Sequence, residues 1–447
     1  MTILVLNGSP AGENSITLQT VKYLQKTCPD HSWRFLNVGQ KIRAFEHDFS
    51  EARKALEEAE LILFAYPVYT FLVPAQLHRF IELIKEQGPD LSGKFASQLT
   101  TSKHFYDTTA HEFIRENCAD LGLRFVNGLS ADMEDLLHKK GQKEARAWFR
   151  HLLWSAERGL DRPACRPAEA GELKKIPVPV NSRPKRKKGR IVIVTDLGPD
   201  SVRLKDMIRR FEAFSYYDCE TVDLREFAFA GGCLGCFHCA SDGTCIYRDG
   251  FDSFLREKIQ TADATVYAYR IQDHSMGYRF KLYDDRQFCN GHRTVTMGKP
   301  VGYLVDGGLS AEANLRQLME ARAQVGGNYL AGIACSEGAP EEIDALAENL
   351  DYAVRHRYEE PANFYGVGGL KIFRDLIYQM QGLMREDHRF YRSHGFYDFP
   401  QKHRGRIAAM YLVGAMMKNP KIGKKAGVSM TQGMLMPYKR VLEKAEP

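Results

Sequence analysis

The first 161 residues alternate between short, continuous apolar runs and longer segments in which apolar residues recur every three to four positions. The apolar runs are predicted strands at residues 3–6, 33–38, 61–65, 95–100 and 124–127. The longer segments are predicted helices at residues 15–26, 50–59, 74–86, 108–121 and 134–158. Continuous apolar strands are typical of a parallel sheet that is covered on both faces. Residues 1–161 are therefore predicted to form a doubly wound, five-stranded α/β domain.

The same alternation returns after residue 189 and predicts a second five-stranded α/β domain over residues 190–358. Its predicted strands are 190–195, 218–224, 264–269, 300–305 and 328–334. Its predicted helices are 201–214, 250–260, 311–324 and 340–356. Each domain begins with a strand, a polar turn with Gly or Pro, and a helix. The two segments are therefore interpreted as a distant tandem repeat.

Two segments lie outside these domains. Residues 162–189 contain five prolines, lack a hydrophobic period and end in a basic run, which predicts a linker. The basic run could bind nucleic acid or another anionic surface, but no aromatic residues are interleaved with it, so a solvated tether is favoured. Residues 359–447 are rich in aromatic, Met and basic residues. They predict a mostly helical C-terminal extension that packs on the second domain or on a second subunit.

Composition and charge limit the class of protein. The 447 residues are 44% hydrophobic and 26% charged, which excludes a disordered chain. Lys and Arg outnumber Asp and Glu by only 62 − 56 = 6, so we expect no nucleic-acid partner. The first residues, MTILVLNGSP, lack the features of a signal peptide, and the longest apolar stretch, 407–417, is shorter than the ~20 residues of a membrane span. We expect a cytoplasmic protein without a membrane span.

The turn after the first predicted strand has the chemistry of a phosphate site. NGSPAGENS offers the side chains of Ser9, Asn14 and Ser15, with backbone N–H groups at the start of a helix. It lacks the Lys of a GxxxxGK[ST] loop and the pattern GxGxxG, which disfavours nucleoside triphosphates and dinucleotides. A polar turn with a helix cap is the simpler alternative. The turn predicts a site for a phosphate monoester.

Two further loops are expected at the same edge of the sheet. The loop after the third strand presents Pro67, Val68, Tyr69, Thr70 and Phe71, a suitable wall for a flat aromatic ring. The loop after the fourth strand adds polar and aromatic residues, among them Thr101, Ser102, His104 and Tyr106. Phosphate-binding, stacking and hydrogen-bonding loops together indicate flavin mononucleotide (FMN).

These segments carry a family resemblance. GSPxxxNS followed by PVYxxxVPAQLxxFIE resembles the flavodoxin-like NAD(P)H-dependent FMN reductase and quinone reductase superfamily. The resemblance implies that Ser9, Asn14 and Ser15 hold the FMN phosphate. It also implies that the residues from 67 to 71 lie along the isoalloxazine and that those from 101 to 104 complete the pocket. The family often has Arg after GSP, where this chain has Ala11. This departure weakens phosphate binding or moves the positive charge elsewhere.

The second domain contains four closely spaced cysteines. Cys233, Cys236, Cys239 and Cys245 follow the spacing C-x2-C-x2-C-x5-C, which suits the four ligands of a [4Fe–4S] cluster. Zinc is an alternative, but four-thiolate zinc sites typically use two cysteine pairs a dozen or more residues apart. A loop without any metal is the other alternative. The motif resembles that of the iron–sulfur flavoproteins, which implies a cluster near the flavin.

The sequence allows two positions for the flavin, one in each domain. In the second domain, the turn 196–201 carries two carboxylates, and 270–276 lacks the PVY pattern, but 306–309 resembles a glycine-rich flavin loop. We expect FMN in the first domain. FMN in the second domain, beside the cysteines, is the alternative.

The predicted function is an NAD(P)H-dependent flavin oxidoreductase that couples FMN to a [4Fe–4S] cluster and works as a homo-oligomer. Its electrons would pass to a small-molecule acceptor or to a redox partner protein. The catalytic candidates are Tyr69, His104 and Tyr106, the last two as proton donors. The alternatives are an electron carrier without its own substrate and a zinc-binding structural or regulatory protein.

Overall fold

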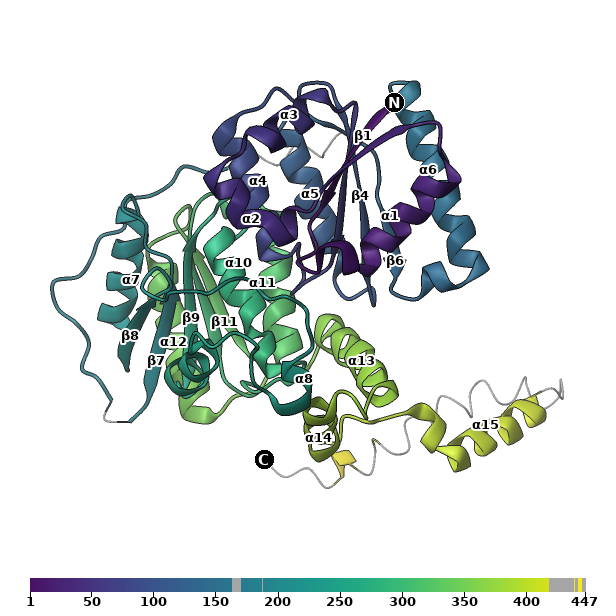
Figure 1. Ribbon diagram of the computed structural model, residues 1–447. Coiled ribbons are helices and arrows are strands. Elements are labelled where there is room, and N and C mark those ends of the chain that lie inside the picture. Colours follow the sequence, from purple (N-terminus) through teal and green to yellow (C-terminus); the bar gives the residue numbers. More distant parts are fainter. Residues whose placement is uncertain (163–169, 187, 418–437, 439–440, 444–447) are drawn as a thin grey trace. The chain divides into compact units, whose positions relative to one another are not determined.

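The computed structural model describes residues 1–162, 170–186, 188–417, 438 and 441–443 (Figure 1). They divide into two compact units, Met1–Phe390 and Tyr391–Pro447. Parts of the predicted linker (163–169 and 187) and of the predicted C-terminal extension (418–437, 439–440 and 444–447) lie outside the described residues. Within unit 1, we use the term first half for residues 1–161 and second half for residues 190–358.

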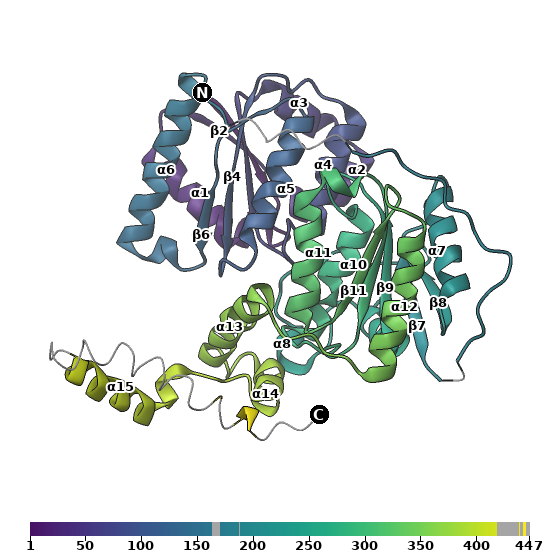
Figure 2. The same ribbon diagram turned by 180° about the vertical axis from the view of Figure 1, so that it is seen from behind.

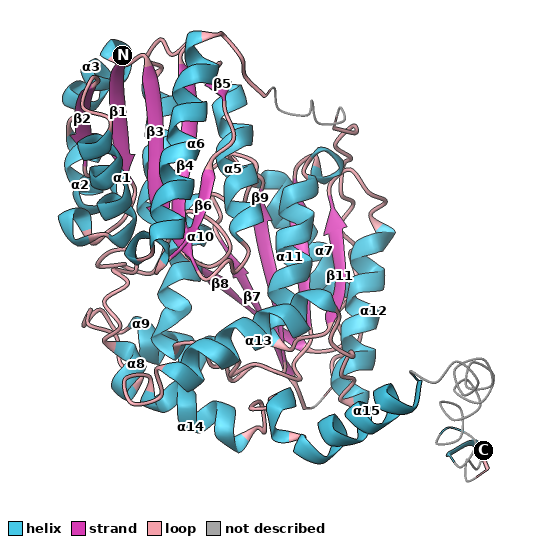
Figure 3. Cartoon of the chain, turned by 90° about the vertical axis from the view of Figure 1, so that its right-hand side faces the viewer, coloured by secondary structure: helices cyan, strands magenta, loops and turns pink. Residues whose placement is uncertain are grey.

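The first half is built on a parallel sheet in the order β2-β1-β3-β4-β5, with β6 also paired to β4. The strands are β1 (Thr2–Asn7), β2 (Ser32–Leu36), β3 (Leu61–Pro67), β4 (Phe95–Ser102), β5 (Arg124–Phe125) and β6 (Leu129–Asp132). The helices are η1 (Gly12–Asn14), α1 (Ile16–Thr27), α2 (Val38–His47), α3 (Ser50–Glu58), α4 (Ala75–Gln87), α5 (Asp107–Asp120), η2 (Asp135–Leu137) and α6 (Lys139–Glu157). Figure 3 shows the strands side by side with helices on both faces.

The fifth strand is broken into β5 and β6, whereas the sequence predicts one strand over 124–127. Gly128 lies in the break, and a Cβ there would come within 2.5 Å of the Gln98 carbonyl oxygen. Only glycine fits such a close backbone approach without displacing β4.

The second half contains a parallel sheet in the order β11-β10-β9-β7-β8. Its strands are β7 (Arg190–Thr195), β8 (Asp218–Asp223), β9 (Ala264–Arg270), β10 (Val301–Asp306) and β11 (Leu330–Cys335). Its helices are α7 (Val202–Phe214), α8 (Cys239–Asp242), α9 (Phe251–Ser253), the π-helical η3 (Phe254–Ile259), α10 (Tyr278–Arg286), η4 (Gln287–Asn290), η5 (Leu309–Ala311), α11 (Ala313–Gly326) and α12 (Glu341–His356). The predicted fold class, two doubly wound parallel sheets, is confirmed.

Residues after 358 are mainly helical. Unit 1 also contains α13 (Phe364–Gln379), which packs against α11. The remaining elements are α14 (Arg385–Ser393), η6 (Pro400–Lys402) and α15 (Arg404–Met417). Among the helices in the described part of the chain, none is both long enough and apolar enough to span a membrane.

The two halves share one central core. On the outer faces, α1 and α6 cover the first sheet, and α7 and α12 cover the second. Between the sheets, α4 packs against α10 and α5 against α11 (Figure 2). A single cluster of buried apolar residues runs through this layer and includes side chains of both sheets.

Two helices of this central layer are absent from the sequence prediction. Helix α2 has ten residues, begins at the end of the predicted strand 33–38 and is kinked at Lys41, so its amphipathic pattern is short and interrupted. Helix α10 buries charged side chains, among them Lys281 and Asp285, so its buried face does not appear as an apolar stripe. Tertiary pairing of charges, which a hydrophobicity pattern does not report, accounts for this failure.

The basic run before β7 is held against the second half. The guanidinium of Arg183 lies 4.9 Å from the ring centroids of both Phe214 and Tyr216. Arg186 pairs with Asp351 through two hydrogen bonds of 2.5 and 2.9 Å. These contacts differ from the solvated tether that the sequence favours, because the cations find aromatic and acidic partners within unit 1.

Candidate functional site

The predicted phosphate loop is a tight turn between β1 and α1. Ser9 Oγ accepts from the Ala11 N–H at 3.3 Å, and Ser15 Oγ caps α1 by accepting from the Leu18 N–H at 3.4 Å. Both serines are 3% exposed, and each hydroxyl keeps a proton to donate near the positive end of the 12-residue α1. Asn14 is exposed beside them. These neutral donors fit a phosphate monoester.

The backbone around this loop is packed closely. A Cβ at position 39 would lie 2.3 Å from the Gly8 carbonyl oxygen, so α2 presses its glycine against the loop. The loop itself contains no Lys or Arg. Glu13 accepts hydrogen bonds from Asn37 at 2.9 Å and from Lys22 at 2.5 Å, which together lower the pKa of its carboxyl. The charge missing at Ala11 is therefore not replaced within the loop.

The predicted flavin wall forms a sharp turn after β3. The Tyr69 and Leu72 backbones exchange two hydrogen bonds of 2.9 Å, and Thr70 and Phe71 take positive φ values of 38° and 70°. Such a turn reverses the chain direction within four residues. Pro67 and Val68 precede it and are half-buried.

Phe71 lies apart from the other wall residues. Its side chain is 3% exposed and packs against Phe105 and Tyr106, with ring centroids 5.0 and 4.4 Å away. The Arg322 guanidinium lies 5.3 Å from the same ring. Phe71 can therefore offer its backbone to a flavin, while its ring belongs to the core.

The loop after β4 joins the other two. Thr101 Oγ1 lies 2.6 Å from Thr17 Oγ1 in the first turn of α1, and its carbonyl accepts from the Val68 N–H at 3.3 Å. Ser102 Oγ accepts from the His104 N–H at 2.9 Å. The predicted phosphate, wall and pocket loops are thus brought together at the carboxyl ends of β1, β3 and β4.

The two proton-donor candidates differ in their contacts. His104 is exposed, and its Nδ1 lies 2.9 Å from Asp107 Oδ2. Tyr106 donates its hydroxyl proton to the Tyr365 carbonyl oxygen of α13 at 2.8 Å. Burial raises the pKa of Tyr106, so this hydroxyl stays protonated.

The second half supplies a clamp on the flavin-wall turn that the sequence prediction missed. Lys281 Nζ donates to the Tyr69 carbonyl at 2.9 Å and to Thr70 Oγ1 at 2.6 Å, and it pairs with Asp285. Asp285 Oδ2 accepts from the first N–H of α4, that of Ala75, at 2.8 Å. Lys281 and Asp285 are fully buried. Their spacing of four residues is the only local signal that could have indicated the pair.

The cysteine motif lies directly against the same turn. A Cβ at position 235 would lie 1.9 Å from Tyr69 Oη, and Gln76 Nε2 donates to the Cys233 carbonyl at 3.3 Å. Tyr69 and Phe288 form an edge-to-face pair with centroids 6.2 Å apart. The four cysteines are therefore next to the predicted flavin wall of the first half, although they belong to the second.

A fifth cysteine, absent from the predicted ligand set, joins this group. Cys289 is buried and directly follows Phe288, whose carbonyl oxygen accepts from the Cys239 thiol at 2.9 Å. Burial and neighbouring thiols raise the pKa of Cys239 to about 11. Burial is also the main cause that raises the pKa of Cys289 to about 12. The sequence gives no hint of this neighbour because it lies 44 positions beyond Cys245 (245 to 289).

The sulfurs are not gathered at zinc-like distances. Four thiolates around zinc lie roughly 3.8 Å apart, given Zn–S bonds of about 2.3 Å. In the described residues, the groups of three potential ligands within 4.8 Å are His78–Glu82–Asp273 and Glu116–His274–Glu312, and neither includes a cysteine. This spacing disfavours a preformed zinc site.

The glycine-rich loop of the second half is covered by the chain itself. A Cβ at position 308 would lie 2.3 Å from the Ala170 side chain, and the Lys174 N–H donates to the Ser336 carbonyl at 2.7 Å. Asp306 pairs with Arg203 at 3.0 Å. The segment before the second half thus runs over the position where a flavin loop would have to open.

Comparison with known proteins gives a match in the first half. Residues 1–130 match the family model described as NADPH-dependent FMN reductase. The ribosyldihydronicotinamide dehydrogenase [quinone] of Rattus norvegicus is 29% identical over 119 residues, which are 27% of this chain and 43% of that protein. The aligned part is thus less than half of that relative.

Solved structures of a quinone oxidoreductase and of an azoreductase each overlap about a third of the chain. The NAD(P)H:quinone oxidoreductase from Methanothermobacter marburgensis is 14% identical with a TM-score of 0.28, over 34% of this chain and 94% of that one. An FMN-dependent NADH-azoreductase from Bacillus anthracis is 13% identical with a TM-score of 0.27, over 36% and 99%. The match to the family described as NADPH-dependent FMN reductase thus extends over residues 1–130, less than a third of the 447 residues.

Proposed function

We propose that the chain is an NAD(P)H-dependent oxidoreductase that binds one FMN in its first half and reduces a quinone, a free flavin or a similar acceptor. The observation that carries the proposal is the convergence of three loops at one sheet edge in the segment that matches the FMN reductase family. The closed glycine-rich loop of the second half supports the same assignment.

Each loop would have a separate task. Ser9, Asn14 and Ser15 would hold the phosphate, with the first amides of α1. The turn at Tyr69, whose carbonyl accepts a hydrogen bond from Lys281, would orient the isoalloxazine ring system. Bound FMN would supply hydride acceptance and the delivery of one or two electrons at a time.

The reaction would balance as a hydride from NAD(P)H and one proton from solvent, which together reduce the acceptor by two electrons and two protons. His104 would pass that solvent proton, since its ring is exposed and Asp107 holds its Nδ1. The Tyr69 ring would line the face on which a flat acceptor stacks.

We further propose that Cys233, Cys236, Cys239 and Cys245 hold a [4Fe–4S] cluster beside this site. Their loop touches Tyr69, and Cys236 is exposed while the other three are partly buried. A cluster there would supply one-electron exchange at the surface. An electron carrier that serves a partner protein is the second candidate, and the exposed position of Cys236 is the observation in its favour.

Two matched substitutions test the location of FMN. Ser15→Asp keeps a good helix cap but places a negative charge in the phosphate loop, whereas Ser201→Asp makes the same change at the cap position of α7. FMN fluorescence titration of the full chain should give one FMN per chain, at least tenfold weaker binding for Ser15→Asp and little change for Ser201→Asp. The reverse pattern would move FMN to the second half, and no uptake at all would contradict the proposal.

Anaerobic purification with iron and sulfide analysis tests the cluster. Cys236→Ser should lose iron and keep FMN. Steady-state NAD(P)H oxidation with a quinone distinguishes an oxidoreductase from an electron carrier, because a pure carrier would show little turnover.

A further inference from the structure

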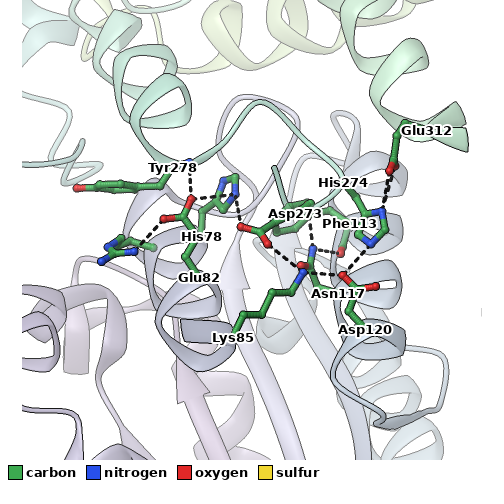
Figure 4. A network of polar contacts seen from close by, with 11 residues as sticks. His78, Glu82, Lys85, Phe113, Asn117, Asp120, Asp273, His274, Tyr278 and Glu312 are labelled. Atoms are coloured by element: carbon green, nitrogen blue, oxygen red, sulfur yellow. Dashed lines mark hydrogen bonds and ion pairs between the residues drawn. The ribbon is translucent and has the colours of Figure 1, made fainter. Parts of the chain in front are cut away.

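A buried histidine at the contact between the halves has no hydrogen-bond partner. His78 of α4 is fully buried, and among the described residues neither of its ring nitrogens is hydrogen-bonded. Its Nε2 lies 3.9 Å from Glu82 Oε1 and 3.9 Å from Asp273 Oδ2 (Figure 4). These separations are too long for hydrogen bonds, but three such atoms can surround a metal ion at about 2.1 Å after small side-chain rotations.

The two carboxylates point one oxygen each at this imidazole. Arg79 pairs with Glu82 Oε2 at 3.0 Å, and Lys85 pairs with Asp273 Oδ1 at 2.9 Å. Glu82 Oε1 also accepts from the Tyr278 N–H at 2.8 Å, which leaves it a second lone pair. Glu82 and Asp273 keep 16% and 13% exposure, so an ion can enter from their side.

A related contact on the other side of the same interface has a cation at its centre. The turns at Tyr69–Leu72 and Gln272–Ser275 have the same pairing, and both have positive φ at their two central residues, 38° and 70° in the first and 51° and 61° in the second. Asp285 accepts from the first N–H of α4, and Glu82 accepts from the first N–H of α10. All these equivalent residues are 203 positions apart (69 to 272, 82 to 285), so the halves meet with pseudo-twofold symmetry.

By this symmetry His78 corresponds to Lys281 (78 to 281). The Lys281 ammonium lies between Thr70 Oγ1, at 2.6 Å, and Asp285. At the His78 position the hydroxyl is replaced by the carboxylate of Asp273, and the ammonium by an imidazole. The Lys281 site thus holds a cation that is part of the chain. The His78 site has one more carboxylate, and among the described residues no ammonium lies between Glu82 Oε1 and Asp273 Oδ2.

The surroundings carry excess negative charge. Three basic side chains, Arg79, Lys85 and His274, are shared among six carboxylates, and His274 bridges two of them at 3.0 and 3.1 Å. The six are Glu46, Glu82, Glu86, Asp120, Asp273 and Glu312. Such a field favours a divalent cation over an empty site.

We propose that His78, Glu82 and Asp273 bind one divalent cation of the class that takes nitrogen and carboxylate ligands, such as Mn²⁺ or Zn²⁺, and that this ion fastens the first half to the second. Two ligands come from one face of α4 at a spacing of four residues, and the third comes from the turn before α10. The group Glu116–His274–Glu312 is different, because both ring nitrogens of His274 already have carboxylate partners.

Manganese is the appropriate probe because the cysteine thiolates prefer softer metals. Mn²⁺ is titrated into the chelator-treated, full-length protein, and free Mn²⁺ is followed by electron paramagnetic resonance. We expect one Mn²⁺ per chain and a rise in the thermal midpoint. His78→Gln and Asp273→Asn should each weaken binding at least tenfold, while Glu116→Gln, in the neighbouring group, should leave it unchanged.

A second variant keeps the test informative if His78→Gln folds poorly. His78→Lys copies the tethered cation of the symmetric position, so it should fold and have a thermal midpoint that neither Mn²⁺ nor chelator changes. Absence of Mn²⁺ binding up to about 1 mM, binding that survives His78→Gln, or a His78→Lys midpoint that still rises with Mn²⁺ would overturn the proposal.

Discussion

His104 and Tyr106 lie two residues apart in the loop after β4, yet their side chains have different hydrogen-bond partners. The Tyr106 hydroxyl is committed to the Tyr365 carbonyl, and its pKa is raised by burial. His104 is exposed and contacts Asp107 through one nitrogen. A proton donor must reach its acceptor, which favours His104.

Tyr106→Phe should therefore lower stability by about 1 kcal/mol, the usual value of one hydrogen bond, and leave kcat within a factor of about three. His104→Gln should lower kcat by about 100-fold with little change in stability. Steady-state kinetics and urea unfolding of both variants check this. A large loss of kcat in Tyr106→Phe alone would reverse the assignment.

At the same scale, the buried Lys281–Asp285 ion pair should lose much stability when one of its partners is removed. Lys281→Met should destabilise unit 1 by about 3–5 kcal/mol, because it leaves the Asp285 charge without its ammonium. Lys281→Met/Asp285→Asn should recover part of that loss. Urea unfolding measures both, and a single variant as stable as the double one would contradict this account.

At the scale of elements, the loop that carries the cysteines is anchored by one ion pair. Arg286 of α10 donates two hydrogen bonds to Asp249, of 2.7 and 2.8 Å, and a third to the Gly231 carbonyl at 2.9 Å. It thereby joins both ends of the cysteine loop to α10. Burial opposes the charge of Asp249, but Arg286 and the Ala230 N–H outweigh it and lower the pKa of Asp249 to about 2.

This pair should make stability depend on acid pH. Because the folded pKa lies below the ordinary value of 3.8, its contribution is present above about pH 4 and is lost as the pH falls toward 2. Urea unfolding of wild type and Asp249→Asn should show a stability gap at about pH 6 that narrows at about pH 3. A gap that does not change with pH would contradict this.

The sequence predicts local features and misses contacts between distant elements. The strands and the phosphate turn are encoded in runs of adjacent residues, and the structure brings Ser9, Thr101 and Tyr69 to one sheet edge as expected. The roles of Lys281 and Cys289 were not predicted, because each depends on contacts with residues that are distant in the sequence. Helix α10 was missed for the same reason.

At the scale of the whole molecule, the central core joins both halves into one cooperative body. Leu318→Ala in α11 removes a buried side chain from the shared core and should cost about 2–5 kcal/mol. Amide exchange should then accelerate together in β3 and β9. Leu137→Ala, at a leucine that is 77% exposed, is the matched control and should change neither. Faster exchange in β9 alone would show that the halves unfold separately.

The pseudo-twofold relation between the halves has an evolutionary consequence. In a homodimer, one gene encodes both sides of the interface, so each substitution appears on both sides. A duplicated and fused chain can change each copy separately, as at His78 and Lys281. One half is then free to keep its turn between β1 and α1 while the other acquires the four-cysteine motif, so the two halves can diverge in chemistry while they keep the contact between them.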